Sequence, residues 1–148
     1  MKFADIGLSD ELLSAVTAKG YDTPTPIQAQ AIPSVLMMKD IIGVAQTGTG
    51  KTASFVLPMI DILAHGRRRA LMPRSLILEP TRELAAQIAD SFDTYGRYLD
   101  LWHTVIFGGV SDKAQIRQLK DGVDALVATP GRLMDHLINK NVKLQDIK

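Results

Sequence analysis

The sequence predicts an α/β fold in which an open parallel sheet is flanked by helices. The chain has 148 residues, of which 46% are hydrophobic and 22% charged, as is typical of one globular domain. Short apolar runs alternate along it with segments of helical periodicity. Because parallel neighbours need a crossover connection that can hold a helix, this alternation favours a parallel sheet covered on both faces.

Two helices are expected near the start of the chain. The first covers residues 10–19, since Ser9 is a favourable N-cap residue and Gly20 a favourable stop. The second begins at residue 26 and passes through Ile32, because a threonine followed by a proline matches the N-cap and first-turn preferences of a helix.

Four strand-to-helix units are expected after residue 40. The strands are predicted at 41–45 (IIGVA), 75–79 (SLILE), 102–107 (WHTVIF) and 124–128 (DALVA). The first is followed by a helix through Phe55, Pro58, Ile60 and Leu63, and the others by helices over about 82–98, 112–119 and 130–139. Residues 65–74 (HGRRRALMPR) are expected to form a solvated loop.

Composition excludes several classes of function. The chain has no cysteine, and its three histidines show no metal-ligand spacing, so a metal ion would arrive with a substrate. The net charge of +1 leaves nucleic-acid contact to local patches. No apolar run is long enough to span a membrane and no signal peptide is recognisable, so we expect a cytoplasmic protein without a membrane partner.

The segment AQTGTGKT at residues 45–52 matches the phosphate-binding loop GxxxxGK[ST], except that Ala45 replaces the first glycine. Glycines let backbone N–H groups approach an anion, and the following helix N-terminus favours negative charge. Lys51 would reach the β- and γ-phosphates, and the Thr52 hydroxyl would bind Mg²⁺. The alternative is a glycine-rich turn with a surface lysine. The loop indicates a nucleoside triphosphate, and leaves kinases, transporters, motors and helicases open.

The segment GYDTPTPIQ at residues 20–28, with Phe3 seventeen residues before it, resembles the Q motif of DEAD-box RNA helicases. The resemblance implies that the Gln28 amide pairs with adenine while Phe3 stacks on the ring. An amide offers one donor and one acceptor edge that complement adenine N6 and N7. The alternative is that Gln28 is a solvated helix residue and Phe3 a core aromatic.

The resemblance implies that one set of residues binds the adenine nucleotide ATP. Of these, Lys51 and Thr52 are the expected catalytic residues, and Thr52 is the expected Mg²⁺ ligand in the nucleotide complex. The full set is Phe3, Tyr21, Thr23, Gln28, Gln46, Thr47, Gly48, Thr49, Gly50, Lys51 and Thr52.

Three later segments resemble the RNA-binding motifs of the same family, and each follows a predicted strand. They are PTRELA at 80–85, the pair Gly108 and Gly109, and TPGR at 129–132. They would lie at the carboxyl edge of the sheet, where open α/β sheets bind ligands. Contact with phosphates and 2′-hydroxyls implies little sequence preference but a preference for RNA. The expected RNA-binding residues are Pro80, Thr81, Arg82, Gly108, Gly109, Thr129, Gly131 and Arg132.

Each of these segments also has a structural explanation. The two threonines could cap helices, the glycine pair could form a turn, and the arginines could be solvated. A basic patch of Arg67, Arg68, Arg69 and Arg74 is a weaker candidate for RNA contact.

The resemblance implies a Q-motif helical region at residues 1–40 and part of a first RecA-like P-loop NTPase domain at 41–148. The Asp-Glu-Ala-Asp motif does not occur in the sequence, so the chain is expected to stop before the Walker B strand. The resemblance implies that the second RecA-like domain lies outside this sequence, so we expect nucleotide binding rather than efficient hydrolysis. An ATP-dependent RNA helicase, complete only in a longer protein, is the leading hypothesis. The alternatives are a nucleotide-switched RNA-binding module without hydrolysis and a small-molecule kinase.

Overall fold

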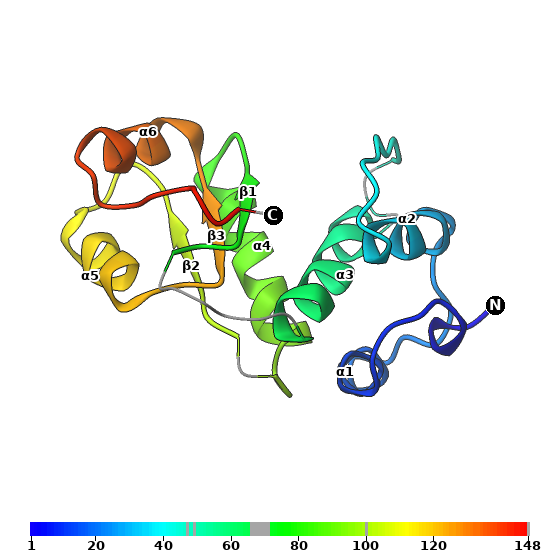
Figure 1. Ribbon diagram of the computed structural model, residues 1–148. Coiled ribbons are helices and arrows are strands. Elements are labelled where there is room, and N and C mark those ends of the chain that lie inside the picture. The colour runs from blue at the N-terminus through cyan, green and yellow to red at the C-terminus, as the bar shows by residue number, and fades with distance from the viewer. Residues whose placement is uncertain (47, 49, 66–71, 100, 148) are drawn as a thin grey trace. The chain divides into compact units, whose positions relative to one another are not determined.

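The computed structural model describes residues 1–46, 48, 50–65, 72–99 and 101–147 (Figure 1). The chain forms two compact units, residues 1–66 with 91–100 and residues 67–90 with 101–148. Helix α4 (Arg82–Tyr95) begins in the second unit and ends in the first. Among the described residues, no helix is both long and apolar enough to cross a bilayer.

The first unit is helical. It contains the short 3₁₀ turn η1 (Phe3–Asp5) and the helices α1 (Asp10–Ala18), α2 (Pro26–Leu36) and α3 (Lys51–His65). Helices α2 and α3 pack against each other (Figure 1). Their apolar faces supply fully buried side chains, among them Ile32, Leu57 and Ile60, as helical periodicity predicts.

Helix α1 is attached to α3 by a hydrogen bond to the backbone of its N-cap residue. Ser9 lies at the predicted N-cap, but its side chain makes no capping hydrogen bond. Its backbone N–H instead donates to Oδ2 of Asp61, which lies on α3, over 2.9 Å. The predicted position was therefore right and the expected side-chain role was wrong.

The second unit is built on a parallel three-stranded sheet in the order β1-β3-β2. The strands are β1 (Ser75–Leu78), β2 (His103–Ile106) and β3 (Ala125–Ala128), and the helices α5 (Lys113–Asp121) and α6 (Pro130–Ile138) follow β2 and β3. All four residues of the central β3 are buried, as expected for a strand in the middle of a parallel sheet. The core of this unit is formed by Ile106, Leu119, Leu126, Ala128, Leu133 and Val142.

The predicted strand at 41–45 does not form. These residues lie outside regular secondary structure, and the side chains of Ile42 and Val44 are 96% and 90% exposed. A strand requires a neighbour to complete its backbone hydrogen bonds, and within the described part of the chain this segment pairs with none. Three of the four predicted strands were therefore correct, with ends displaced by one residue.

The helix predictions were correct in type and approximate at their ends. Helix α2 extends four residues past Ile32. Helix α4 stops at Tyr95 rather than residue 98, where Gly96 follows it. Of the predicted loop at 65–74, residues 66–71 lie outside the described part of the chain.

Candidate functional site: a nucleotide cavity and a sheet edge

A cavity of about 280 Å³ in the first unit gathers most of the residues predicted to bind the nucleotide. This volume is near the lower end for small-molecule sites. Its lining combines aromatic rings, an amide, hydroxyls and glycine backbone, which suits a purine with a polar tail. Lining residues predicted from the sequence are Phe3, Tyr21, Thr23, Gln28, Gly48, Gly50 and Thr52, and residues that sequence reasoning left out of the site are Thr25, Ala53, Ser91 and Tyr95.

Gln28 connects the start of α2 to the phosphate loop. Its Oε1 accepts a hydrogen bond from the backbone N–H of Thr25 over 3.0 Å, and its Nε2 donates to the carbonyl of Gly50 over 3.2 Å. The first bond is half of a capping box, in which the Thr25 hydroxyl accepts in return from the Gln28 N–H. Gln28 is only 7% exposed, so the alternative of a solvated residue is wrong.

Two separate features favour glycine at residue 50. Its φ of +80° is a conformation that side chains disfavour. A Cβ atom built on it would also overlap Nε2 of Gln28 and lie 3.4 Å from the Thr25 hydroxyl oxygen. The loop therefore passes against the amide without a side chain between them.

The N-terminus of α3 forms one end of the cavity, where the sequence predicts the phosphates. This helix begins at Lys51, whose side chain is exposed, and Thr52 lines the cavity behind it. The first backbone N–H groups of a helix lack partners within it and favour an anion. Lys51 and Gln46 do not line the cavity, and Thr47 and Thr49 lie outside the described residues.

Phe3 is both a core residue and part of the cavity wall. Only 5% of it is exposed, and its backbone N–H donates to the carbonyl of Asp22 over 3.1 Å. That bond joins the backbone of residue 3 to the segment at residues 20–28. The two interpretations of Phe3 are therefore compatible.

Ser91 and Tyr95 come from the last turns of α4, outside every recognised motif. They are four residues apart, so they share one face of the helix. Burial raises the pKa of the Tyr95 phenol, with a smaller contribution from Tyr21. The i, i+4 spacing alone could have paired them but could not assign them to this cavity.

The three RNA-motif segments lie at the carboxyl edge of the sheet in the second unit. Backbone hydrogen bonds continue the ladder just past the strands, from Glu79 N–H to the carbonyl of Ala128 and from Thr129 N–H to that of Ile106. The segments therefore follow directly on the ends of adjacent strands. The Thr81 hydroxyl caps α4 by accepting from Leu84 N–H over 3.2 Å.

The three segments differ in how their polar groups are used. Thr129 stands at the N-cap of α6 but makes no side-chain capping bond, contrary to the capping explanation. Arg82 is more than half exposed and lies beside Gly109, where a Cβ atom would be 3.2 Å from its Nη1. Pro80, Gly108 and Gly131 are exposed at the same edge.

Arg132 is engaged within the chain. Its Nη2 donates to the carbonyl of Val110 over 3.1 Å and its Nη1 to Oε1 of Gln115 over 3.3 Å. The side chain is only 14% exposed. The structure thus ties this arginine to the loop after β2.

Arg74 does not belong to an exposed basic patch, contrary to the prediction. Arg74 is 7% exposed and its Nη2 lies 2.8 Å from Oδ1 of buried Asp124. A buried arginine in an ion pair is not available to a ligand at the surface, so the inclusion of Arg74 in a basic patch was wrong. The other members, Arg67, Arg68 and Arg69, lie outside the described residues.

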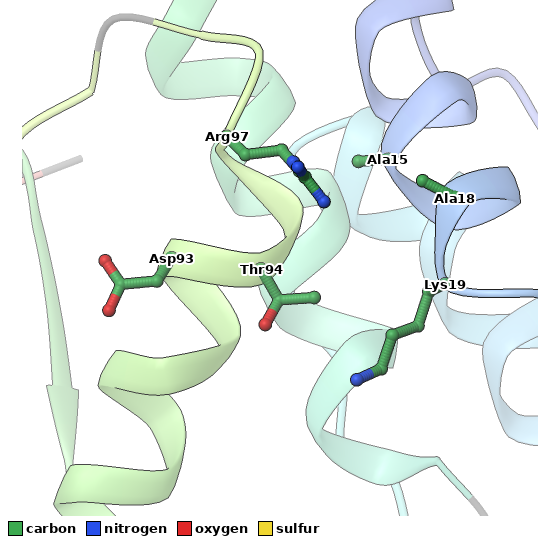
Figure 2. A pocket seen from close by; sticks show the side chains of 6 residues that line it. All are labelled: Ala15, Ala18, Lys19, Asp93, Thr94 and Arg97. Atoms are coloured by element: carbon green, nitrogen blue, oxygen red, sulfur yellow. The ribbon is translucent and has the colours of Figure 1, made fainter.

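A second hollow, of about 310 Å³, lies between the ends of α1 and α4 in the first unit (Figure 2). Lys19 and Arg97 point toward it and Asp93 points away. Lys19 is the C-cap residue of α1, where the helix dipole favours positive charge, and Arg97, two residues past α4, lies over the Tyr98 ring with its Cζ 5.3 Å from the ring centre. Their positions are explained without a ligand. Among the residues that the structure describes, no group of three or more acidic or histidine side chains could hold a metal ion.

The sequence of residues 25–148 matches the family model described as DEAD/DEAH box helicase. The chain belongs to this family. The match covers most of the chain and begins at the Thr25 capping box, so it includes the phosphate loop and all three segments at the sheet edge.

Similar proteins carry helicase names. The chain is 46% identical over its whole length to the ATP-dependent RNA helicase CshA of Limosilactobacillus reuteri, covering 29% of that protein. It is 42% identical to the ATP-dependent RNA helicase DeaD of Mycobacterium tuberculosis, with 98% of the chain and 25% of the relative covered. The chain thus spans less than a third of these relatives.

The fold matches a solved member of the family. The crystal structure of a DEAD box protein from Methanococcus jannaschii superposes with a TM-score of 0.91 at 37% identity, covering all of this chain and 40% of the other. The expected RecA-like α/β class with an open parallel sheet is confirmed. The division at residue 40 into a Q-motif region and a RecA-like region stays a prediction.

Proposed function

We propose that the chain is the ATP-binding and RNA-backbone-binding part of the first RecA-like domain of an ATP-dependent RNA helicase. The complete protein would separate short RNA duplexes. The observation that carries this proposal is the cavity in which the Gln28 amide meets the glycine loop at Gly50. One surface there joins a base-recognition group to an anion-binding turn.

The hydrogen-bonding capacity of Gln28 supports adenine as the base. A side-chain amide has two donor hydrogens and two acceptor lone pairs. One acceptor position is used by Thr25 N–H and one donor by the Gly50 carbonyl. One donor and one acceptor remain, the combination that adenine N7 and N6 require. Guanine offers O6 in place of the N6 amino group and would oppose the amide acceptor.

The phosphate end of the nucleotide would lie over the N-terminus of α3. There the backbone N–H groups of the first turn and the exposed Lys51 favour a triphosphate. Mg²⁺ would be held by the Thr52 hydroxyl together with the phosphates, in keeping with its preference for oxygen ligands and few protein groups. These residues bind and orient the substrate, and hydrolysis would need further groups.

The sheet edge supports contact with an RNA backbone. It presents the capped N-terminus of α4, the exposed Arg82 and the glycine pair 108–109 on adjacent loops. Helix N-termini and arginines are common phosphate ligands, and such contacts carry little sequence information. We therefore expect binding to RNA of varied sequence.

Nucleotide selectivity of the full-length gene product tests the proposal. ATP should bind better than GTP, and Gln28→Ala should reduce the ATP-to-GTP affinity ratio about tenfold, within the range for a bidentate base contact. The matched control is Gln30→Ala, on the same helix but exposed. Equal affinities for ATP and GTP in the wild type would contradict the adenine assignment.

RNA-dependent phosphate release and separation of a short RNA duplex test the remaining part. Both activities are expected of the full-length protein. If it binds ATP selectively and binds RNA but does neither, the nucleotide-switched binding module becomes the better description.

A further inference from the structure

A buried polar network lies beneath the loop that follows β2. Its members are the side chains of Gln115 on α5 and of Arg132 and His136 on α6, with Asn141 beyond α6. Gln115 is 6% exposed and His136 1%. Buried polar groups are costly unless they are hydrogen-bonded, so this set must satisfy its members mutually.

Gln115 is the centre of the network. Its Nε2 donates to the carbonyl of Phe107 at the start of the loop, over 3.1 Å. Its Oε1 accepts from Nε2 of His136 over 2.9 Å and from Nη1 of Arg132 over 3.3 Å. One amide thus holds the loop backbone and a guanidinium at the same time.

His136 is held in a single tautomer by its two neighbours. Since Nε2 faces the carbonyl oxygen of Gln115, it carries the hydrogen, and Nδ1 accepts from Nδ2 of Asn141 over 3.1 Å. Burial lowers the pKa of His136, and the charge of Arg132 lowers it further. This shift favours the neutral ring, and the two lone pairs of Gln115 Oε1 accept from Nε2 of His136 and from Nη1 of Arg132.

The network fixes the Arg132 guanidinium against the loop. Its Nη2 donates to the carbonyl of Val110, directly after the glycine pair, and its Nε lies 3.9 Å from Asp135. Arg82, by contrast, has a side chain that is 55% exposed, and its Nε lies 3.3 Å from Oε1 of the exposed Glu83 on the same helix. Of these two arginines, Arg82 can turn to a phosphate at little cost.

We propose that Gln115 is a positioning residue for RNA binding: it holds Arg132 against residues 107–110, so that Arg132 shapes this loop while Arg82 supplies the cation that meets the phosphate. The proposal rests on the RNA-binding function proposed above and gives the two arginines different roles in it. Arg132 acts through the loop it braces, whereas Arg82 lies at the rim beside Gly109.

The salt dependence of RNA affinity distinguishes an arginine that binds a phosphate from one that only positions the loop. Each phosphate neutralised on single-stranded RNA contributes about 0.7 to the slope of log affinity against log salt. In the full-length gene product, measured by fluorescence anisotropy with a labelled oligouridylate, Arg82→Ala should reduce that slope by about 0.7. Arg132→Ala and Gln115→Met should each weaken binding about tenfold at unchanged slope, as expected for a lost hydrogen bond to a charged group.

A double-mutant cycle tests whether the two residues act together. The Gln115→Met, Arg132→Ala double variant should bind RNA no more weakly than Arg132→Ala alone, since both changes release the same contact. Gln118→Met is the matched control, because Gln118 lies on the same helix and accepts from the Thr104 hydroxyl, away from the loop. It should bind RNA as the wild type does.

Arg132→Lys keeps the test decisive even if Gln115→Met does not fold. Lysine retains the charge but lacks the fork that reaches Val110 and Gln115 together. It should therefore behave like Arg132→Ala if the residue is a brace. Wild-type affinity in Arg132→Lys, or a reduced slope in Arg132→Ala, would overturn the positioning role while RNA binding stands. A wild-type protein that binds no RNA at any salt concentration would overturn both proposals.

Discussion

The close approach of Gly50 to the Gln28 amide can be tested by substituting Gly50 and, as a control, Gly48. Gly50→Ala adds a Cβ that overlaps the Gln28 amide and also strains a residue at φ +80°. Gly48→Ala imposes similar strain at φ +84° but meets nothing within 4 Å. Both should lose about 1–2 kcal/mol of unfolding free energy. Only Gly50→Ala should also lower the ATP-to-GTP affinity ratio.

Isothermal titration with the two nucleotides, alongside urea unfolding, measures both quantities for this glycine pair. Equal loss of selectivity in the two variants would mean that loop strain, rather than contact with Gln28, controls base recognition.

Lys51 tests the phosphate end of the same cavity. Because its side chain is exposed at the start of α3, removing it should leave the core intact. Lys51→Ala should weaken ATP binding at least tenfold while the thermal midpoint moves little, since it removes a cation beside the triphosphate. Lys39→Ala, at an exposed lysine of the same unit, is the control. An unchanged ATP affinity would remove Lys51 from the site.

The sequence predicted the residues of this cavity better than the contacts of Arg132 and Arg74, which lie in the second unit. Gln28 and Gly50 were found because each belongs to a short local motif, the first at residues 20–28 and the second at residues 45–52. Arg132 was expected to face RNA, but its partner Gln115 lies seventeen residues earlier on another helix. No local pattern encodes a contact of that kind. Arg74 was misjudged for the same reason, since its partner Asp124 is fifty residues away.

At the scale of elements, one carboxylate joins the starts of all three strands. Asp124 precedes β3, its Oδ1 pairs with Arg74 before β1, and its Oδ2 accepts from the backbone N–H of Trp102 before β2 over 2.9 Å. The Asp124 carbonyl also accepts from Arg74 and Ser75 N–H. Asp124 is only 2% exposed. Its charge is therefore needed to balance a buried guanidinium.

Asp124→Asn should destabilise the protein by about 3–5 kcal/mol, because it removes the carboxylate from its ion pair with the buried Arg74 guanidinium. The double variant with Arg74→Met should recover part of this loss, since the guanidinium that lost its carboxylate partner is then removed as well. Urea unfolding of each variant measures the effect, and Asp121→Asn, exposed at the end of α5, is the control. Wild-type stability in Asp124→Asn would show that the pair contributes nothing to the sheet.

Helices and strands were predicted correctly where neighbouring residues determine them, and wrongly where a distant segment does. Helices α1 to α6 follow from capping residues and apolar periodicity within each segment. The segment 41–45 has the composition of a buried strand, yet Ile42 and Val44 are exposed. Composition shows that a segment can form a strand, but pairing depends on a neighbour elsewhere in the fold. Sequence alone therefore gave four strands where the described chain has three.

For the whole molecule, two histidines predict how stability varies with pH. In the first unit, hydrogen bonding to the Asp61 backbone carbonyl raises the pKa of His65 above its ordinary 6.5. Burial opposes this shift, and the Asp61 and Glu11 carboxylates each add a smaller increase. In the second unit, burial and then Arg132 lower the pKa of His136 below the same value. The two shifts are opposite in sign and act in different units.

The signs give two separate pH windows. Folded His65 binds more protons than the unfolded chain above about pH 6.5, so its contribution is complete below that value and lost as pH rises through the raised pKa. Unfolded His136 binds more protons below about pH 6.5, so its contribution is present above that value and lost as pH falls through the lowered pKa. The histidine contribution to stability should therefore be greatest near the ordinary histidine pKa.

Thermal unfolding between about pH 5.5 and 7.5 tests this, since histidine is the side chain that ordinarily titrates in that range. His65→Gln should flatten the decline on the alkaline side and leave the acid side unchanged, whereas His136→Gln should flatten only the acid side. The effect of His65 should be the smaller, because its side chain is 51% exposed and solvent screens its ion pairs. If either substitution altered the opposite side of the profile, the pKa direction assigned to that histidine would be wrong.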